Sequence, residues 1–340
     1  MRESFPISDH CDGRSFFNPG GRAGTRGLLQ VLRWRMRGGR ITWMRPPPDP
    51  SFPPPPLDVP PGHAAISHIN HASFLIRFPG VVVLTDPIFS QRCSPVSWAG
   101  PQRARPPGIP LDDLPRPDVV VLSHNHYDHM DLPSLRELRR RHAPRFITTL
   151  GNGRALAREG IQATELDWWQ DAEHGPLRIT ATPARHFAAR TPFDRNRTLW
   201  AGFMLRAGGG QVLFAGDSAA GSHWADIAAR LGPPDVALLP IGAYEPRWFM
   251  AAAHMNPAEA VEAHRMLRAR RSIGMHFGTF QLTDEAIDAP LEALAAARQQ
   301  ARLPPAIFTT HGFGETRLYE LGAPTRIDAG VWPQEGPEPK

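Results

Sequence analysis

The segment Pro117–Asp131, PDVVVLSHNHYDHMD, places four metal-binding side chains directly after a run of aliphatic residues. Val119–Leu122 is continuously apolar, as expected of a strand that is buried on both faces. Three histidines and one aspartate follow within six positions: His124, His126, Asp128 and His129. Because protonated histidines this close would repel one another, the cluster predicts neutral imidazoles that bind a cation.

The spacing within this cluster suits two ions. In an extended segment, residues two apart project to the same side, so His124 and His126 can bind one ion. Asp128 and His129 then face a second ion nearby. An HxH pair alone is weak evidence, because most such pairs are packed or hydrogen-bonded histidines, but the full HxHxDH spacing after a strand is a strong signal.

Three further candidate ligands follow other strand-like runs: His186, Asp217 and His276. Taken singly, each is ordinary, since an aspartate after a strand is often a helix N-cap and a histidine beside a phenylalanine is often a packed side chain. Taken together, they supply the ligands that two ions still need. Imidazole and carboxylate suit zinc best here, and iron and manganese are left open.

The composition limits what else can hold a metal. The chain has 340 residues, of which 41% are hydrophobic, so it can bury a substantial core. Its two cysteines, Cys11 and Cys93, are too few for a disulfide framework or a zinc site built from four thiolates. Any metal must therefore be held by histidine and aspartate.

The charge and hydropathy pattern indicates where the protein acts. No apolar run reaches the roughly 18 residues of a membrane-spanning helix, and the N-terminal residues lack the apolar stretch of a signal peptide. We expect a cytoplasmic protein that contacts membranes peripherally at most. The net charge of +5 comes almost wholly from arginine, since Lys340 is the only lysine. A nucleic-acid partner is not expected, because the basic residues lack an interleaved aromatic stacking track.

Composition divides the chain into a basic arm (residues 1–45), a proline-rich strap (46–62), the main domain (63–322) and a C-terminal tail (323–340). Ten of the sixteen residues in Pro46–Pro61 are proline, which excludes a helix or a central strand. The arm either packs a short helix on the main domain or lies against anionic lipid. Its arginines are Arg22, Arg26, Arg33, Arg35, Arg37, Arg40 and Arg45.

Helical and strand-like patterns alternate through the main domain, which predicts an α/β fold with mixed sheets covered by helices. The predicted helices are Leu132–Arg141, Gly151–Arg158, Ser222–Leu231, Pro257–Arg270 and Pro290–Ala301. The predicted strands are Ser73–Phe78, Val81–Pro87, Val119–Leu122, Arg145–Thr148, Leu177–Thr182, Leu199–Arg206, Gln211–Ala215, Asp235–Ile241, Ile273–Met275 and Ala306–Thr309.

The order HxHxDH, His, Asp, His resembles the metallo-β-lactamase superfamily. This resemblance implies a four-layer αββα sandwich with a dinuclear metal site between the sheets. Longer segments are similar to the N-acylphosphatidylethanolamine-hydrolysing phospholipase D family, from about Ile66 to His311. They are HASFLI (71–76), LTDPIFSQRCSP (84–95), SHNHYDHMD (123–131), ELDWW (165–169), RTPFDRNRTLW (190–200), PIGAYEPRWFM (240–250) and HFGTF (276–280).

The resemblance implies specific roles for the candidate residues. The first ion would be held by His124, His126 and His186, and the second by Asp128, His129 and His276. Asp217 would bridge both ions. Tyr127 and His254 would line the substrate site. The implied activity is phospholipase D-type hydrolysis of N-acylphosphatidylethanolamine to N-acylethanolamine and phosphatidic acid, and a homodimer is implied as well.

We expect a metal-bound hydroxide to attack phosphorus, with Asp128 orienting it. His254 would contact the phosphate or protonate the leaving alcohol. Arg190 and Arg247 are candidates to neutralise the substrate phosphate, because a guanidinium offers a planar fork of donors. An ion pair between Arg247 and Glu245 is the alternative for that arginine.

Two segments depart from the family pattern: GDSAAG follows the expected bridging aspartate, and FMAAAH precedes His254. Both changes bear on the substrate rather than on the chemistry. Another hydrolase on this scaffold, either a sugar-phosphate lactonase or a general phosphodiesterase, therefore stays open. A non-catalytic, membrane-associated protein is a further alternative.

Overall fold

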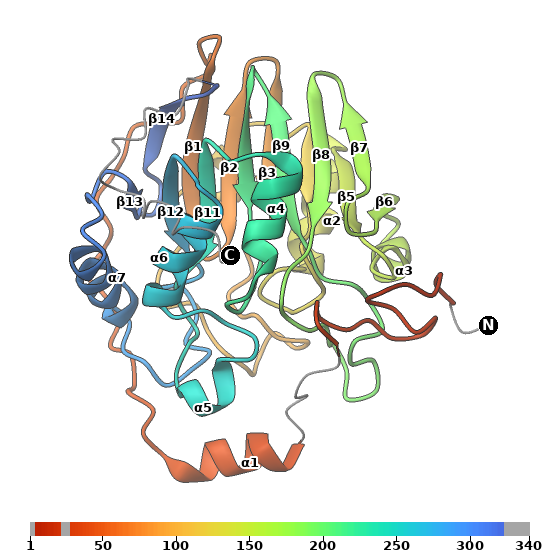
Figure 1. Cartoon of the computed structure of the whole chain (residues 1–340), viewed down its shortest axis with the longest axis vertical. Coiled ribbons are helices and arrows are strands. Elements are labelled where there is room, and N and C mark those ends of the chain that lie inside the picture. The colour runs from red at the N-terminus through yellow and green to blue at the C-terminus, as the bar shows by residue number, and fades with distance from the viewer. Residues whose placement is uncertain (1–3, 22–27, 323–340) are drawn as a thin grey trace, which may run out of the picture.

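The computed structural model, which describes residues 4–21 and 28–322, contains two mixed sheets packed face to face (Figure 1). The first has the strand order β14-β1-β2-β3-β4-β5-β6 and the second β13-β12-β11-β10-β9-β8-β7. The first sheet comprises β1 His63–Asn70, β2 Ser73–Phe78, β3 Val81–Thr85, β4 Val119–Val121, β5 Arg145–Thr149, β6 Ala163–Leu166 and β14 Thr316–Glu320. The second comprises β7 Asp171–His174, β8 Leu177–Thr182, β9 Gly202–Ala207, β10 Gly210–Phe214, β11 Val236–Pro240, β12 Arg271–Met275 and β13 Phe308–Thr309.

Helices cover the outer face of each sheet. The helices α2 Leu132–His142 and α3 Gly153–Arg158 pack on the first sheet, and α4 His223–Leu231, α6 Pro257–Met266 and α7 Ala289–Gln300 on the second (Figure 1). The predicted four-layer αββα sandwich is therefore confirmed. Three further elements lie outside these layers: α1 Leu28–Arg37, the 3₁₀ helix Leu111–Asp113 and α5 Arg247–Met250.

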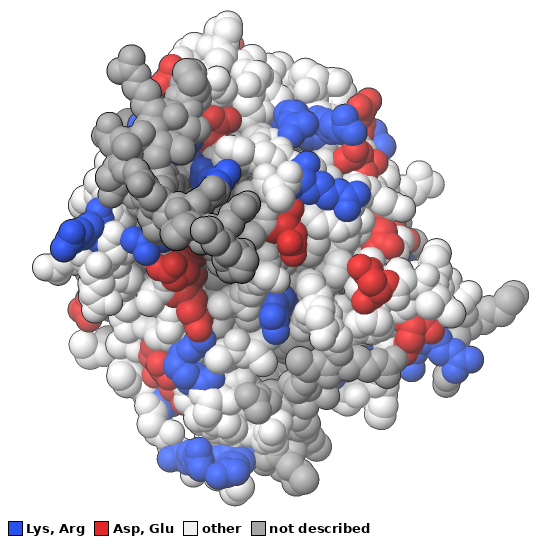
Figure 2. Space-filling view, viewed as in Figure 1, with Lys and Arg blue, Asp and Glu red and all other residues white. Residues whose placement is uncertain are grey.

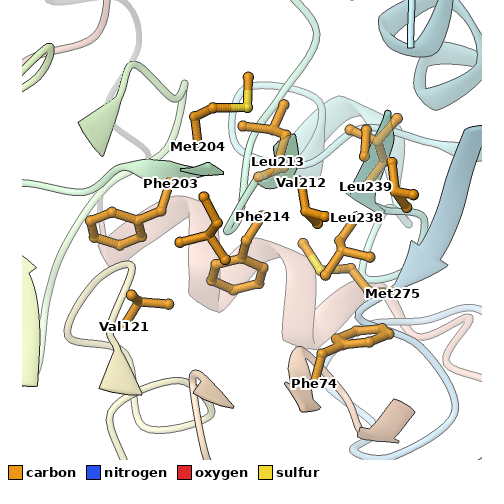
Figure 3. Packing of buried hydrophobic residues seen from close by; sticks show 14 of the residues in the cluster. Phe74, Val121, Phe203, Met204, Val212, Leu213, Phe214, Leu238, Leu239 and Met275 are labelled. Atoms are coloured by element: carbon orange, nitrogen blue, oxygen red, sulfur yellow. The ribbon is translucent and has the colours of Figure 1, made fainter. Parts of the chain in front are cut away.

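The apolar run Val119–Leu122 contains a central strand with both faces buried. In β4, Val119 and Val121 belong to the core between the sheets, whereas Val120 packs on the α2 side. Figure 3 shows Val121 in the intersheet core near Phe203 and Phe214. Replacing a buried phenylalanine of this kind by alanine typically costs about 3–5 kcal/mol, so this layer contributes strongly to stability.

Strand direction decides where the site lies. In the first sheet β3, β4, β5 and β6 run parallel, and in the second β10, β11, β12 and β13 do. Because β9 is antiparallel to both β8 and β10, β8 also shares the direction of β10. The carboxyl ends of β4, β8, β10 and β12, which precede the candidate ligands, therefore meet at one edge.

The predicted elements are present, and some of their ends differ. The helix predicted to reach Arg270 stops at Met266, because Arg268 adopts a left-handed φ of 52° that no helix can continue. The strand predicted from Leu199 begins at Gly202, since the Leu199 amide donates to Leu150 instead of to a neighbouring strand. The sequence did not indicate β1, β6, β7, β14 or α5.

The arm packs on the main domain. Trp34 of α1 stacks on Phe249 of α5 with ring centroids 5.0 Å apart, and its Nε1 donates to Asp284 Oδ2 at 2.7 Å. Arg33 and Arg37 lie over the Trp248 ring at 5.9 and 5.1 Å. The predicted short helix on the main domain is confirmed. Arg22, Arg26 and the tail from residue 323 lie outside the described residues.

His10 attaches the first part of the arm through two carboxylates. Its Nδ1 lies 2.6 Å from Asp9 Oδ1 and its Nε2 lies 2.7 Å from Asp167 Oδ1, with Trp168 stacked on the ring at 4.2 Å. Burial lowers the pKa of His10, but the two carboxylates outweigh burial and raise it above 6.5. The imidazolium form therefore stabilises the folded arm below pH 6.5, and this contribution is lost as pH rises through the raised pKa.

We predict that residues 4–21 exchange amide hydrogens faster at pH 9 than at pH 6, after correction for intrinsic exchange rates. His10→Gln should remove this difference, whereas His174→Gln should not. Hydrogen–deuterium exchange with mass spectrometry measures the effect. Equal corrected protection at both pH values in the wild type would contradict the assigned role of His10.

Candidate metal centre

The loop after β4 supplies four candidate ligands because it turns tightly. The amides of His129 and Met130 both donate to the His126 carbonyl, at 3.1 and 2.8 Å, which closes one helical turn before α2. This turn directs His124 and His126 to one point and Asp128 and His129 to another. The spacing predicted the same division.

The first group of ligand atoms consists of three imidazole nitrogens. His126 Nδ1 lies 2.8 Å from His124 Nε2 and 3.2 Å from His186 Nε2. The second group consists of one carboxylate and two imidazoles. Asp128 Oδ2 lies 3.4 Å from both His129 Nε2 and His276 Nε2.

Asp217 lies between the two groups. Its Oδ2 is 3.2 Å from the Nε2 atoms of both His129 and His276. The same oxygen is 4.0 Å from His124 Nε2 and 3.6 Å from His186 Nε2. Ligands about 2.0–2.1 Å from a tetrahedral zinc ion are about 3.3 Å apart, so both groups have the spacing of a coordination shell. The structure thus brings all seven predicted ligands together.

Unpartnered buried atoms provide an independent test of the metal assignment. His129 Nε2, His276 Nε2 and Asp217 Oδ1 are buried and have no hydrogen-bond partner. Burying polar atoms without partners costs free energy, so such atoms are rare unless a ligand or ion binds them. All three belong to the ligand groups, and the residues present therefore fit one or two divalent cations.

The charges in the cluster are arranged for cations. Burial lowers the pKa of His126 to about 3 and of His186 to about 4, so the first group offers neutral imidazoles. Burial also lowers the pKa of His276, but Asp217 and Asp128 outweigh it and raise the value to about 9. Without a metal, protons on the second group supply the positive charge that the two carboxylates require.

Hydrogen bonds orient the imidazoles. Ser123 Oγ lies 2.9 Å from His124 Nδ1, and the Ala253 carbonyl lies 2.9 Å from His186 Nδ1, which leaves Nε2 of each ring free. Asp86 Oδ2 does the same for His129 Nδ1 at 2.6 Å. His71 Nε2 is 2.9 Å from Asp128 Oδ2, so this histidine orients the carboxylate of the second ligand group.

Asp86 was missed in the sequence, although a signal was present. It follows β3, which pairs in parallel with β4, so its side chain reaches the same sheet edge as His124. It also accepts hydrogen bonds from the Ser123 amide and hydroxyl, at 2.8 and 2.5 Å. His311, another buried histidine, lies 2.7 Å from Tyr319 Oη through its Nε2 and does not contact the ligand groups.

The backbone at the site is strained. His71, Asp86 and His276 adopt positive φ values of 46°, 32° and 63°, which residues other than glycine rarely adopt. Gly216, beside Asp217, has a φ of 59°, and a Cβ there would lie 2.8 Å from both Ala201 O and Ser123 Cβ. Glycine is thus required for this loop to approach β4.

A cavity of about 600 Å³ opens onto the ligand groups. His126, Asp128, His186, Asp217 and His254 form its polar end. Its remaining wall is largely apolar and comes from the arm, the loop after β8, and α5 with the residues that follow it. The apolar wall residues are Phe16, Phe17, Val31, Trp34, Phe187, Ala243, Phe249, Met250, Ala252, Ala253 and Leu282.

The arm also supports a ligand directly. Asn18 Oδ1 accepts hydrogen bonds from the His186 amide at 2.9 Å and from Trp200 Nε1 at 3.1 Å. Both donors are buried, so Asn18 satisfies two polar groups behind the first ligand group. No local pattern predicts this contact, because residue 18 is distant in the chain from the metal-binding pattern.

The predicted substrate residues have different surroundings. His254 lies in the cavity, with Nδ1 3.9 Å from Asp217 Oδ2. Tyr127 donates to the Arg190 carbonyl at 2.9 Å, and the Arg190 guanidinium stacks over its ring at 4.1 Å. Arg190 Nη1 donates to the Asn125 and Met130 carbonyls, both at 2.8 Å. Tyr127 and Arg190 thus hold the metal-binding loop and do not line the cavity.

Arg247 is also used within the protein. Its Nη2 contacts both carboxylate oxygens of Glu259, at 2.9 and 2.7 Å, and its Nη1 donates to the carbonyls of Tyr244 and His254. The expected ion pair with Glu245 is wrong, because the Glu245 carboxylate accepts the Arg247 backbone amide instead. The substrate roles of Tyr127, Arg190 and Arg247 stay predictions.

We predict that Asp86→Asn lowers zinc affinity of the second ligand group roughly 10- to 100-fold, because His129 loses the carboxylate that orients it. Competition with a chromophoric chelator measures this affinity. Asp112→Asn, at an exposed position, is the control. Wild-type affinity in Asp86→Asn would show that His129 does not depend on this hydrogen bond.

Comparison with known proteins agrees with this geometry. Residues 82–277 match the family model described as a β-lactamase superfamily domain, and all seven candidate ligands lie within them. The chain is 39% identical over 226 residues to N-acyl-phosphatidylethanolamine-hydrolyzing phospholipase D 1 of Caenorhabditis elegans, which confirms the resemblance noted in the sequence. That match covers 63% of this chain and 64% of the relative, so it spans less than two thirds of the relative's length.

Two further relatives extend the comparison. A metal-dependent hydrolase of Pyrobaculum aerophilum is 30% identical, over 68% of this chain and 94% of its own. The structure of Igni18, a metallo hydrolase of Ignicoccus hospitalis, has a TM-score of 0.57 at 24% identity, over 76% of this chain and 99% of its own, and shows the shared fold. Since the family model covers more than half of the chain, the protein belongs to the family described as the β-lactamase superfamily domain.

Proposed function

We propose that the protein is a metal-dependent hydrolase that cleaves N-acylphosphatidylethanolamine to N-acylethanolamine and phosphatidic acid. The observation that carries this proposal is the cavity, which joins two metal-ligand groups to a long apolar wall. A phosphodiester with acyl chains has the same division into an anionic and an apolar part. The 39% identity to the C. elegans phospholipase D supports the same substrate.

Two divalent ions in the ligand groups would lower the pKa of a water molecule and neutralise charge that develops on a phosphate. Asp128 would hold its position through the hydrogen bond from His71, so that its carboxylate can orient the nucleophile. His71 is buried, and burial with the nearby His276 lowers its pKa to about 3. It is therefore a neutral donor to Asp128, and it adds no charge to the site.

His254 would contact the substrate phosphate. It lines the cavity, its ring centroid is 4.9 Å from that of His186, and its Nδ1 is buried without a hydrogen-bond partner. Burial holds the pKa of His254 well below 6.5. Of its two expected roles, donation of a hydrogen bond from a neutral ring to a phosphate oxygen therefore fits better than protonation of the leaving alcohol.

We predict that the metal-loaded wild type releases N-acylethanolamine and phosphatidic acid from N-acylphosphatidylethanolamine, as measured by mass spectrometry. Asp217→Asn should lower the rate by roughly a hundredfold or more, because the shared ligand loses its charge. Asp226→Asn, on the exposed face of α4, is the control. Metal content should be measured in each variant.

Other products would redirect the proposal. Cleavage of bis(4-nitrophenyl) phosphate without cleavage of the lipid would favour a general phosphodiesterase, and opening of a lactone would favour a lactonase. Full metal content with no turnover of any of these substrates would contradict the proposal and leave a non-catalytic protein. Undiminished turnover in Asp217→Asn would contradict the role assigned to that residue.

We also propose that the protein contacts anionic membranes through the arm. Exposed arginines and exposed apolar side chains are interspersed along residues 33–45, where no acidic residue occurs. They are Arg33, Met36, Arg37, Arg40, Ile41, Met44 and Arg45. Figure 2 shows the basic patch at the lower edge of the molecule, where α1 lies in Figure 1. Val31 and Trp34 of the same helix line the cavity, so a membrane docked on α1 would lie beside the cavity wall. No helix in the described part of the chain is long and apolar enough to cross a membrane.

We predict that the double substitution Arg33→Gln and Arg37→Gln weakens binding to vesicles containing phosphatidylglycerol by roughly 10- to 30-fold, at about 1 kcal/mol per arginine. Binding to pure phosphatidylcholine should not change. Arg154→Gln with Arg158→Gln, at the same spacing on α3, is the matched control. Vesicle co-sedimentation measures binding, and an equal loss in the control pair would refute a specific role for α1.

A further inference from the structure

One cation on the cavity wall has no hydrogen-bond or ion-pair partner among the described residues. Arg195 is the only arginine or lysine among the described residues that line the cavity. Its guanidinium stacks over the Phe187 ring, with Cζ 4.4 Å from the ring centroid. The Phe187 ring is in turn 4.6 Å from that of His126 and 4.8 Å from that of His186. A single aromatic side chain therefore separates Arg195 from two candidate metal ligands.

Arg195 makes no hydrogen bond or ion pair with any described residue, and its Nε is buried without an acceptor. The adjacent Asp194 does not neutralise it, because Asp194 Oδ1 accepts the backbone amides of Arg190 and Thr191 at 3.0 and 2.8 Å. The carboxylates that line the cavity, Asp128 and Asp217, belong to the ligand groups. The protein therefore leaves this half-buried charge for an external anion.

The lack of a hydrogen-bond or ion-pair partner among the described residues distinguishes Arg195 from Arg190 and Arg247, the arginines that the sequence suggested. The guanidinium of Arg190 is occupied by backbone carbonyls and that of Arg247 by Glu259. Neither lines the cavity. Arg195, in the same loop as Arg190, lines the cavity, and no described residue accepts a hydrogen bond from its guanidinium.

We propose that Arg195 binds an anionic phosphate oxygen of an amphiphilic substrate whose chain lies along the apolar wall. This assignment rests on the proposed lipid hydrolase function and makes Arg195 a specificity-determining residue. A guanidinium matches phosphate oxygens in charge and in the geometry of its N–H groups. The stack on Phe187 holds it in place, so little side-chain entropy is lost on binding. The wall from Phe16 to Phe249 then receives the acyl part.

The test is calorimetric binding to the metal-loaded protein of three probes: monomeric dihexanoyl phosphatidic acid, dihexanoylglycerol and inorganic phosphate. We expect Arg195→Gln to weaken phosphatidic acid binding about tenfold, the usual effect of losing a charge-assisted hydrogen bond, with dihexanoylglycerol unaffected. Arg195→Lys should keep part of the affinity, because the charge stays and the fork is lost.

Arg230→Gln is the matched control, because Arg230 also stacks over an aromatic ring, that of Trp169, at 4.4 Å, but lies outside the cavity. Unchanged affinity of Arg195→Gln for phosphatidic acid, or an equal loss for dihexanoylglycerol, would overturn the proposal. If the wild type bound inorganic phosphate as tightly as phosphatidic acid, the proposal that the ligand is amphiphilic would be overturned. Binding can be measured without turnover. If affinity depended on Arg195 but the lipid were not cleaved, only the proposed hydrolysis would be refuted, and the assignment of Arg195 would stand.

Discussion

The structure depends on one buried carboxylate oxygen. Asp217 Oδ2 has imidazole nitrogens of five histidines within 3.2–4.0 Å: His124, His129, His186, His254 and His276. Such a concentration of lone pairs is unfavourable unless positive charge is supplied, either by protons or by metal ions. The five segments that carry Asp217 and these histidines therefore have to converge, and the arrangement of the two sheets brings them together. The strained backbone at His71, Asp86 and His276 is consistent with a position fixed by ligation rather than by local preference.

The sequence was sufficient to predict this convergence because the relevant signals are local. Each ligand follows a strand with a clear apolar pattern, and parallel strands end at the same edge of a sheet. Elements whose pattern is weak were missed for the same reason. The strand β7, Asp171–His174, has one buried residue in four, and β14, Thr316–Glu320, has one in five. Edge strands of this kind are fixed by pairing with a neighbour, which a single sequence does not show.

The substrate residues were harder to predict, because the role of an arginine depends on its partners. Arg190, Arg195 and Arg247 are equivalent in a sequence, since each stands among polar and aromatic neighbours. Only the fold shows that Arg190 and Arg247 are occupied while Arg195 faces the cavity. The same holds for Asn18, whose hydrogen bond to the His186 amide spans 168 positions of the chain.

The candidate metal ligands and much of the cavity wall thus come from different parts of the chain. All seven candidate ligands lie within the matched residues 82–277, whereas part of the cavity wall lies outside them: Phe16, Phe17, Val31, Trp34 and Leu282. A fold that supplies the metal ligands can serve many reactions, so substrate preference has to come from what is added around it. In this chain the arm makes that addition, and Asn18 couples it to the metal centre. A change in the arm can therefore alter which substrate fits without replacing any metal ligand. Because Asn18 bonds the His186 amide, such a change also affects the support of a candidate ligand.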